Sequence, residues 1–92
     1  MTDHDTRQLK IVNQKGLHAR AAAKLVEVVE GFDADAEVAL NGQSVGGDSI
    51  MGLLMLAAAK GTTIDVQTSG PDAKALGDAI EALIADRFGE DI

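Results

Sequence analysis

The 92-residue sequence contains no cysteine, only one proline and no long run of apolar residues. The absence of cysteine excludes disulfides, thiolate metal sites and thiol catalysis, and it fits a reducing cytoplasm. No segment approaches the roughly 20 apolar residues that cross a bilayer, and the acidic N-terminal stretch lacks the apolar centre of a secretory signal. With 46% apolar residues and no long polar tract, the sequence predicts one soluble, cytoplasmic domain over residues 1–92.

Basic residues are scarce, and their distribution is uneven. The net charge of −7 argues against binding to nucleic acid, whose phosphates require a basic surface. Residues 32–92 carry eleven acidic and three basic side chains, whereas residues 1–31 carry four acidic and five basic ones. Residues 15–24 hold three basic side chains and no acidic one, with His18 near their centre. We therefore expect an anion to be attracted to this segment.

Hydrophobic periodicity predicts four strands and three helices in the order βαββαβα. Alternating apolar and polar residues predict strands in RQLKIVN, AEVAL, QSV and TTIDVQT, with Asn41 and Gly42 forming a type I′ turn between the second and third. Helical spacing predicts helices over residues 19–30 and 72–88, and a shorter one that begins after Asp48 or Ser49. Residues 1–6, including His4, are expected to form a flexible tail.

These elements favour an α+β fold. Strands with one solvated face and helices with one apolar side are satisfied most simply when three helices pack on one face of a four-stranded, largely antiparallel sheet. Periodicity does not determine the order of the strands.

The start of the first helix is the candidate site. The backbone N–H groups of Ala19, Arg20 and Ala21 have no intrahelical partners, and they point toward His18. The helix dipole and the Arg20 guanidinium add positive charge, which suits a phosphate group. Since no acidic residue is near it in the sequence, the His18 ring is expected to be neutral and nucleophilic, and able to carry a phosphoryl group.

A structural role for His18 is the alternative. A histidine beside a helix start is more often a surface residue or a cap than a reactive group. No Ser/His/Asp set or carboxylate pair is identifiable, and two histidines are too few for the usual three or four ligands of zinc, so no metal is expected. From the residues alone, both roles stay open.

Three motifs narrow this choice. GLHARAAAKLV, LNGQSV and DSIMGLLMLAAAKGTTI occur in this order, and together they resemble the HPr family, the histidine-containing phosphocarriers of the bacterial phosphoenolpyruvate-dependent phosphotransferase system. The resemblance implies an open-faced sandwich in which enzyme I phosphorylates a histidine on Nδ1 and an enzyme IIA receives the phosphoryl group. His18 stands at the position of that histidine, and Arg20 at that of the arginine that assists transfer. The chain would be a carrier without a cofactor and not a free-standing enzyme.

The resemblance also points to a regulatory site. In many HPr proteins a dedicated kinase phosphorylates a serine at the start of the second helix, and Ser49 stands at that position. Two residues depart from the family pattern, because Ala21 replaces a common proline and Asp48 replaces a common lysine before the serine. A phosphate on Ser49 would meet the Asp48 carboxylate, so a simple capping role for Ser49 is an equal alternative. The departures favour the regulatory branch of the system slightly over sugar uptake.

The second helix is also a candidate docking surface. It has too many apolar residues for one buried side, and Ile50, Met51 and Leu54 are expected to be exposed beside the site, with Lys24 at the rim. A carrier that presents one face to enzyme I, to enzyme IIA and to a serine kinase is most simply a monomer. Two other function classes remain: a docking module that acts without phosphorylation, or through Ser49, and a small hydrolase that uses His18 as a general base.

Overall fold

The computed structural model describes residues 3–92. Along this part of the chain the elements are β1 (His4–Lys10), α1 (Ala19–Glu30), β2 (Asp35–Leu40), β3 (Gln43–Gly46), α2 (Ile50–Met55), β4 (Thr63–Ser69), α3 (Ala73–Ala85) and a closing 3₁₀ turn (Arg87–Gly89). The predicted βαββαβα order is confirmed. Within the described part of the chain, no helix is long and apolar enough to span a membrane.

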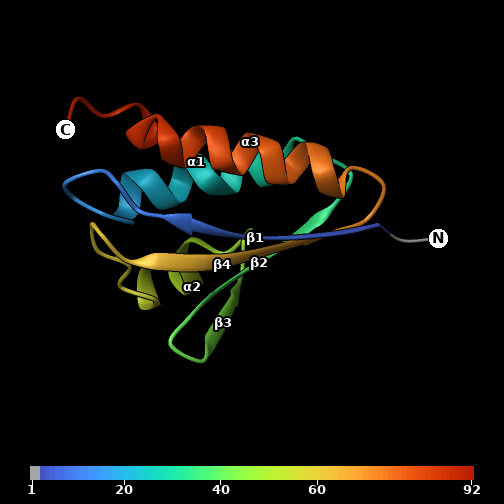
Figure 1. The fold of residues 1–92 in the computed structure, drawn as a ribbon, viewed down its shortest axis with the longest axis horizontal. Coiled ribbons are helices and arrows are strands. Elements are labelled where there is room, and N and C mark those ends of the chain that lie inside the picture. The colour runs from blue at the N-terminus through green and yellow to red at the C-terminus, as the bar shows by residue number, and fades with distance from the viewer. Residues whose placement is uncertain (1–2) are drawn as a thin grey trace.

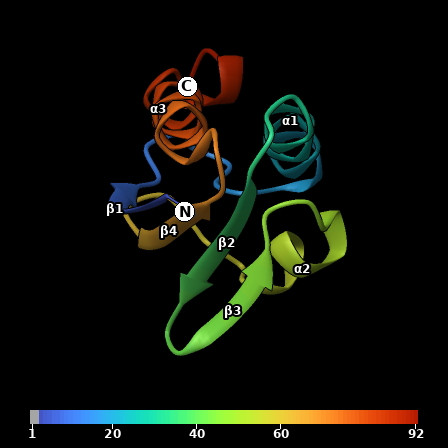
Figure 2. The ribbon, with the colours of Figure 1, turned by 90° about the vertical axis from the view of Figure 1, so that its right-hand side faces the viewer.

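The four strands form one antiparallel sheet in the order β1-β4-β2-β3. The first and last strands of the sequence, β1 and β4, therefore pair at one side of the sheet, and the β2–β3 hairpin forms the other side. All three helices lie on one face of this sheet, where α1 and α3 run side by side (Figure 2). No helix formed by residues 3–92 lies on the other face, so the expected α+β open-faced sandwich is confirmed.

The predicted hairpin turn is also confirmed. Asn41 and Gly42 have φ values of 52° and 80°, and they connect the two strands whose Leu40 and Gln43 are paired. Both central residues of a type I′ turn require positive φ, which asparagine and glycine tolerate.

The predicted N-terminal tail is wrong for residues 4–6. These residues belong to β1, and His4 is the register partner of Ser69 in β4. Backbone hydrogen bonds to a neighbouring strand do not require apolar side chains, so the polar start of β1 pairs as well as its apolar end. Residues 1–2 lie outside the described residues.

The third helix is shorter than its apolar spacing predicted. It ends at Ala85, because Arg87 and Phe88 have φ values of 55° and 54°, which a right-handed helix does not allow. Phe88 nevertheless has no exposed surface. Its apolar side chain is buried by a left-handed turn and not by a further turn of α-helix.

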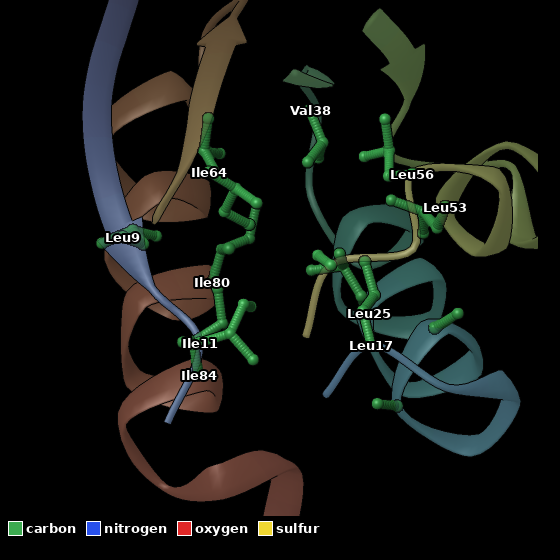
Figure 3. Close-up of a cluster of buried hydrophobic side chains, with 14 of the residues drawn as sticks. Leu9, Ile11, Leu17, Leu25, Val38, Leu53, Leu56, Ile64, Ile80 and Ile84 are labelled. Atoms are coloured by element: carbon green, nitrogen blue, oxygen red, sulfur yellow. The ribbon is translucent and has the colours of Figure 1, made fainter. Parts of the chain in front are cut away.

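The hydrophobic core lies between the sheet and the helices (Figure 3). Leu25 from α1, Val38 from β2, Leu53 from α2, Ile64 from β4 and Ile80 from α3 are all completely buried. Leu9 of β1 is buried in the same cluster, so every α-helix and three of the four strands contribute buried side chains to it.

An ion-pair network joins β1 to α3 at the edge of this core. Arg7 donates from Nε and Nη2 to the two carboxylate oxygens of Asp5, both at 2.7 Å, and from Nη1 to Asp78 at 3.1 Å and Glu81 at 2.9 Å. The two hydrogen bonds from Arg7 to Asp5 hold the pKa of the Asp5 carboxyl below its ordinary value. Gly77 makes room for the guanidinium, since a Cβ at that position would lie 2.9 Å from Nη2.

Candidate functional site

The loop between β1 and α1 presents His18, and Gly16 determines its path. Gly16 has a φ of 68°, and a Cβ on it would lie 2.5 Å from the carbonyl oxygen of Ala58. The next residue, Leu17, is buried, and its N–H donates to the same Ala58 oxygen at 2.9 Å. The loop is thus fixed against the segment between α2 and β4 directly before His18.

α1 begins directly after His18, as the sequence predicted, so His18 occupies the N-cap position. Its extended backbone (φ −83°, ψ −178°) lets its carbonyl accept the first helical bond from Ala22 at 2.8 Å. Its own N–H donates to Gly16 at 3.0 Å, and the helix geometry leaves the N–H groups of Ala19, Arg20 and Ala21 without intrahelical partners. Three donors therefore lie at the positive end of the helix dipole, beside the ring.

His18 has no acidic neighbour in the sequence, but the fold brings one to it. Oε2 of Glu90, 72 positions further along the chain, contacts Nε2 of the ring, whose side chain is 28% exposed. The other oxygen of that carboxylate, Oε1, accepts a hydrogen bond of 3.0 Å from Nδ2 of Asn13. The ring has an oriented acidic partner that sequence proximity did not indicate.

The C-terminal segment is bound to the site at several points. Phe88 is buried in the core, and its carbonyl oxygen accepts a bond of 2.6 Å from Nζ of Lys24 in α1. The carbonyl oxygen of Ile92 accepts a bond of 3.1 Å from the N–H of Gln14. Figure 1 shows the C-terminus at the end of the molecule where α1 begins. These contacts bring Glu90 across to His18.

The site is an open hollow of about 570 Å³. Its lining includes His18 and the three cations of the basic segment, Lys15, Arg20 and Lys24, and the tail adds Glu90 and other residues. The basic cluster expected from the sequence is therefore brought together at one hollow, with an acidic group at its edge.

The charge state of Glu90 follows from its partners. The hydrogen bond from Asn13, and then that from His18, lower the pKa of the Glu90 carboxyl below its ordinary value. Glu90 is consequently a carboxylate at neutral pH, able to accept hydrogen bonds but not to donate them.

The structure places Ser49 at the start of α2, where its Oγ accepts a bond of 3.0 Å from the N–H of Gly52. Ser49 is therefore the N-cap, and Asp48 is not. The expected exposure holds for Ile50 (40%) and Met51 (72%). It is wrong for Leu54, which is half buried against the core on the flank of the helix, whereas Met55, one turn after Met51, is 66% exposed.

Sequence reasoning missed Asn13 and Glu90. Asn13 is completely buried, although it lies in a stretch that reads as a polar loop. Glu90 follows the last apolar residue of the third helix pattern and has no local signal. Only the tertiary structure brings Asn13 and Glu90 to the His18 ring.

Fold and site together define a small open-faced α+β protein with a histidine at the anion-attracting end of a helix. A family model described as the PTS HPr component phosphorylation site matches residues 6–86. The phosphocarrier protein HPr of Cupriavidus necator is 48% identical over 84 residues, which cover 91% of this chain and 94% of that protein. The phosphocarrier protein NPr of Shewanella violacea is 43% identical over 84 residues, covering 91% and 92%.

A structural comparison agrees. The crystal structure of HPr-C-His from Thermoanaerobacter tengcongensis matches with a TM-score of 0.91 and 31% identity, covering 96% of this chain and 99% of that one. The chain belongs to the HPr family, the phosphocarriers of the phosphotransferase system.

Proposed function

We propose that His18 accepts a phosphoryl group from phosphorylated enzyme I and passes it to a histidine of an enzyme IIA. The observation that carries this proposal is the position of the ring at the N-terminus of α1, in the hollow that also contains Arg20. The chain would act in the cytoplasm as the substrate of two other proteins, and it would need no cofactor.

The transfer is a displacement at phosphorus. The Nδ1 lone pair of His18 forms the new phosphorus–nitrogen bond, and the histidine of enzyme I leaves with the electron pair of the old one. The three equatorial oxygens carry the charge. The N–H groups of Ala19, Arg20 and Ala21 and the Arg20 guanidinium are the donors available to them, and hydrogen bonds to charged groups contribute about 1.5–3 kcal/mol each.

The residue Ala21 keeps one of these donors. Proline at this position, common in the family, has no N–H, whereas the N–H of Ala21 is free to bond a phosphoryl oxygen. The Ala21 side chain is completely buried, so packing fixes the first helical turn without the rigid ring of proline.

Partners would dock on the exposed apolar residues of α2. Ile50, Met51 and Met55 offer a flexible apolar surface, with Leu54 on its flank and Lys24 in the nearby hollow. Such a small patch suits brief complexes, which a carrier needs, and a monomer leaves it accessible to enzyme I and to each enzyme IIA.

Phosphorylation of Ser49 by a serine kinase is the proposed regulatory step. The exposed Ser49 hydroxyl caps α2, so a phosphate there would lie at the start of that helix and beside the Asp48 carboxylate. The departures at Ala21 and Asp48 favour a regulatory branch over sugar uptake as the destination of the phosphoryl group.

The test is intact mass after the protein is mixed with enzyme I, magnesium and phosphoenolpyruvate. We expect one added phosphate that is lost on brief acid treatment and is absent from His18→Ala. Arg20→Ala should still accept the group, but more slowly. With an enzyme I shown to be active on another carrier, no added phosphate, or the same phosphate on His18→Ala, would contradict the proposal.

A docking module that works without His18 phosphorylation is the second candidate. It is favoured by the exposure of Met51 and Met55, 72% and 66% respectively. Exposed apolar side chains do not stabilise the core, and together they can form a surface for a partner. For this function His18→Ala would be neutral in the cell and Met51→Asp would be inactive. If the protein is a carrier, both variants would be inactive in the cell, but only Met51→Asp would keep the His18 ring that accepts phosphate.

A further inference from the structure

The contact between His18 and Glu90 involves a part of the chain that the family model does not cover. The family model ends at residue 86, and the left-handed turn at Arg87 and Phe88 and the segment behind it follow that residue. The buried Phe88 side chain and the Lys24 bond to its carbonyl oxygen fix the direction of that segment. Glu90 is thus held at the ring by the fold.

The hydrogen-bond pattern defines the position of the ring proton. A carboxylate can only accept, so a hydrogen bond between Glu90 and Nε2 requires a proton on Nε2. Among the described residues, no hydrogen bond involves Nδ1. In the neutral ring the lone pair is then on Nδ1, the nitrogen that attacks phosphorus in the proposed function.

Asn13 determines how the carboxylate is held. Its Nδ2 donates to the Gly16 carbonyl at 2.8 Å and to Glu90 at 3.0 Å, so the amide cannot turn without losing both bonds. Its Oδ1 is buried and has no hydrogen-bond partner within residues 3–92. An unpaired buried acceptor is unfavourable for folding, so stability alone does not account for an amide here.

We infer that Asn13 and Glu90 are positioning residues for phosphoryl transfer: Asn13 orients the Glu90 carboxylate, and Glu90 holds His18 in the tautomer with its proton on Nε2. This inference rests on the proposed function. When Nδ1 bonds to phosphorus, the ring becomes a cation that keeps its Nε2 proton, and the Glu90 carboxylate faces the developing positive charge. No proton has to leave or enter the His18 ring during the step. Glu90 would select the tautomer and stay ionised, as the aspartate does beside the catalytic histidine of serine proteases.

Glu90→Gln is the variant that separates this role from simple packing. Its amide has one acceptor and one donor group. If the oxygen keeps its bond from Asn13, the NH₂ group faces Nε2 and donates to it, which favours the tautomer with the proton on Nδ1 and blocks the nucleophile. Asn13→Ala frees the carboxylate to turn and should have a weaker effect. Asp86→Asn removes the same charge from an exposed position of the C-terminal stretch and is the matched control.

The first readout is the tautomer of His18, measured by ¹⁵N NMR on the whole unphosphorylated protein at a pH where the ring is neutral. The signals are assigned by comparison with His18→Ala. We expect the Nε2–H form to dominate in the native protein and in Asp86→Asn, and the Nδ1–H form to increase in Glu90→Gln. The second readout is the rate of phosphate gain from enzyme I. We expect a fall of about 10- to 100-fold in Glu90→Gln, the range that a hydrogen bond to a charged group produces, and a change below about twofold in Asp86→Asn.

A native ring with its proton on Nδ1, or a Glu90→Gln variant with unchanged tautomer and unchanged rate, would overturn the inference. Thermal unfolding of each variant shows whether the fold is kept, and the NMR readout needs no phosphorylation. A native protein that takes no phosphate would therefore refute the proposed function, whereas an unresponsive tautomer in a protein that takes phosphate would refute only the positioning role.

Discussion

Replacing Gly16 with alanine tests whether the loop before His18 is as tightly fixed as the structure indicates. Two penalties add. A non-glycine residue in the left-handed region costs about 1–2 kcal/mol, and Gly16 has a φ of 68°. The new Cβ would also lie 2.5 Å from the Ala58 carbonyl oxygen and 3.0 Å from the Ala59 Cα, which are backbone atoms that cannot move aside alone. Overpacking of this kind costs about 1–3 kcal/mol.

Gly42→Ala is the control, since it shares only the first penalty. Gly42 has a φ of 80°, but no atom lies within 4 Å of the position its Cβ would take. The entropy that alanine removes from the unfolded chain is similar at both sites and cancels in the comparison. We therefore expect Gly16→Ala to lose about 2–5 kcal/mol and Gly42→Ala only about 1–2 kcal/mol.

Thermal unfolding followed by circular dichroism measures the difference. In a domain of this size 1 kcal/mol corresponds to about 4–8 °C in Tm, so Gly16→Ala should melt at least about 4 °C below Gly42→Ala. It should also accept phosphate from enzyme I more slowly, because the loop that carries His18 must shift. Equal melting temperatures for the two variants would refute the argument that the loop is fixed by its contact with Ala58.

Three further predictions concern stability. The pKa of Asp5 is lowered by its hydrogen bonds from Arg7, so this pair stabilises the fold above the unfolded pKa of about 3.9, and the stabilisation is lost as pH falls through the lower folded pKa. The free energy of unfolding in urea should therefore fall more steeply below about pH 4 in the native protein than in Arg7→Met. Parallel curves for the two proteins would contradict this. Ser49→Ala should cost about 1 kcal/mol by removing the N-cap of α2, whereas Ser49→Asp, which can still cap, should cost less in the same assay. Ile80→Ala should cost about 2–5 kcal/mol, because its side chain is completely buried; a loss below 1 kcal/mol would mean that the core collapses around the missing atoms.

Much of the fold could be predicted because local chemistry carries it. The alternation in β2 and β4, the positive φ that Asn41 and Gly42 tolerate, and the apolar stripe that includes Leu25 are properties of short stretches. The start of α1 beside His18 is equally local, because the end of a helix leaves free N–H groups wherever it occurs. These signals need no knowledge of distant contacts.

The errors occurred where a distant partner decides the structure. The polar residues from His4 onward form a strand because β4 offers backbone partners, and the apolar spacing up to Phe88 does not continue the third helix because burial of Phe88 is achieved by a left-handed turn. Leu54 is half buried, although its spacing allowed exposure, because it lies against the core.

By itself, the sequence determined the order of the elements, the hairpin and the basic helix start with its histidine, since each depends on neighbouring residues. Only the tertiary structure decided that Asn13 and Glu90 meet at His18. Those three side chains come from a loop, a helix cap and a C-terminal segment, and hydrogen bonds between residues 72 and 77 positions apart leave no periodic trace in the chain. Their meeting depends on the packing of α3 beside α1, which directs the end of the chain back to the site.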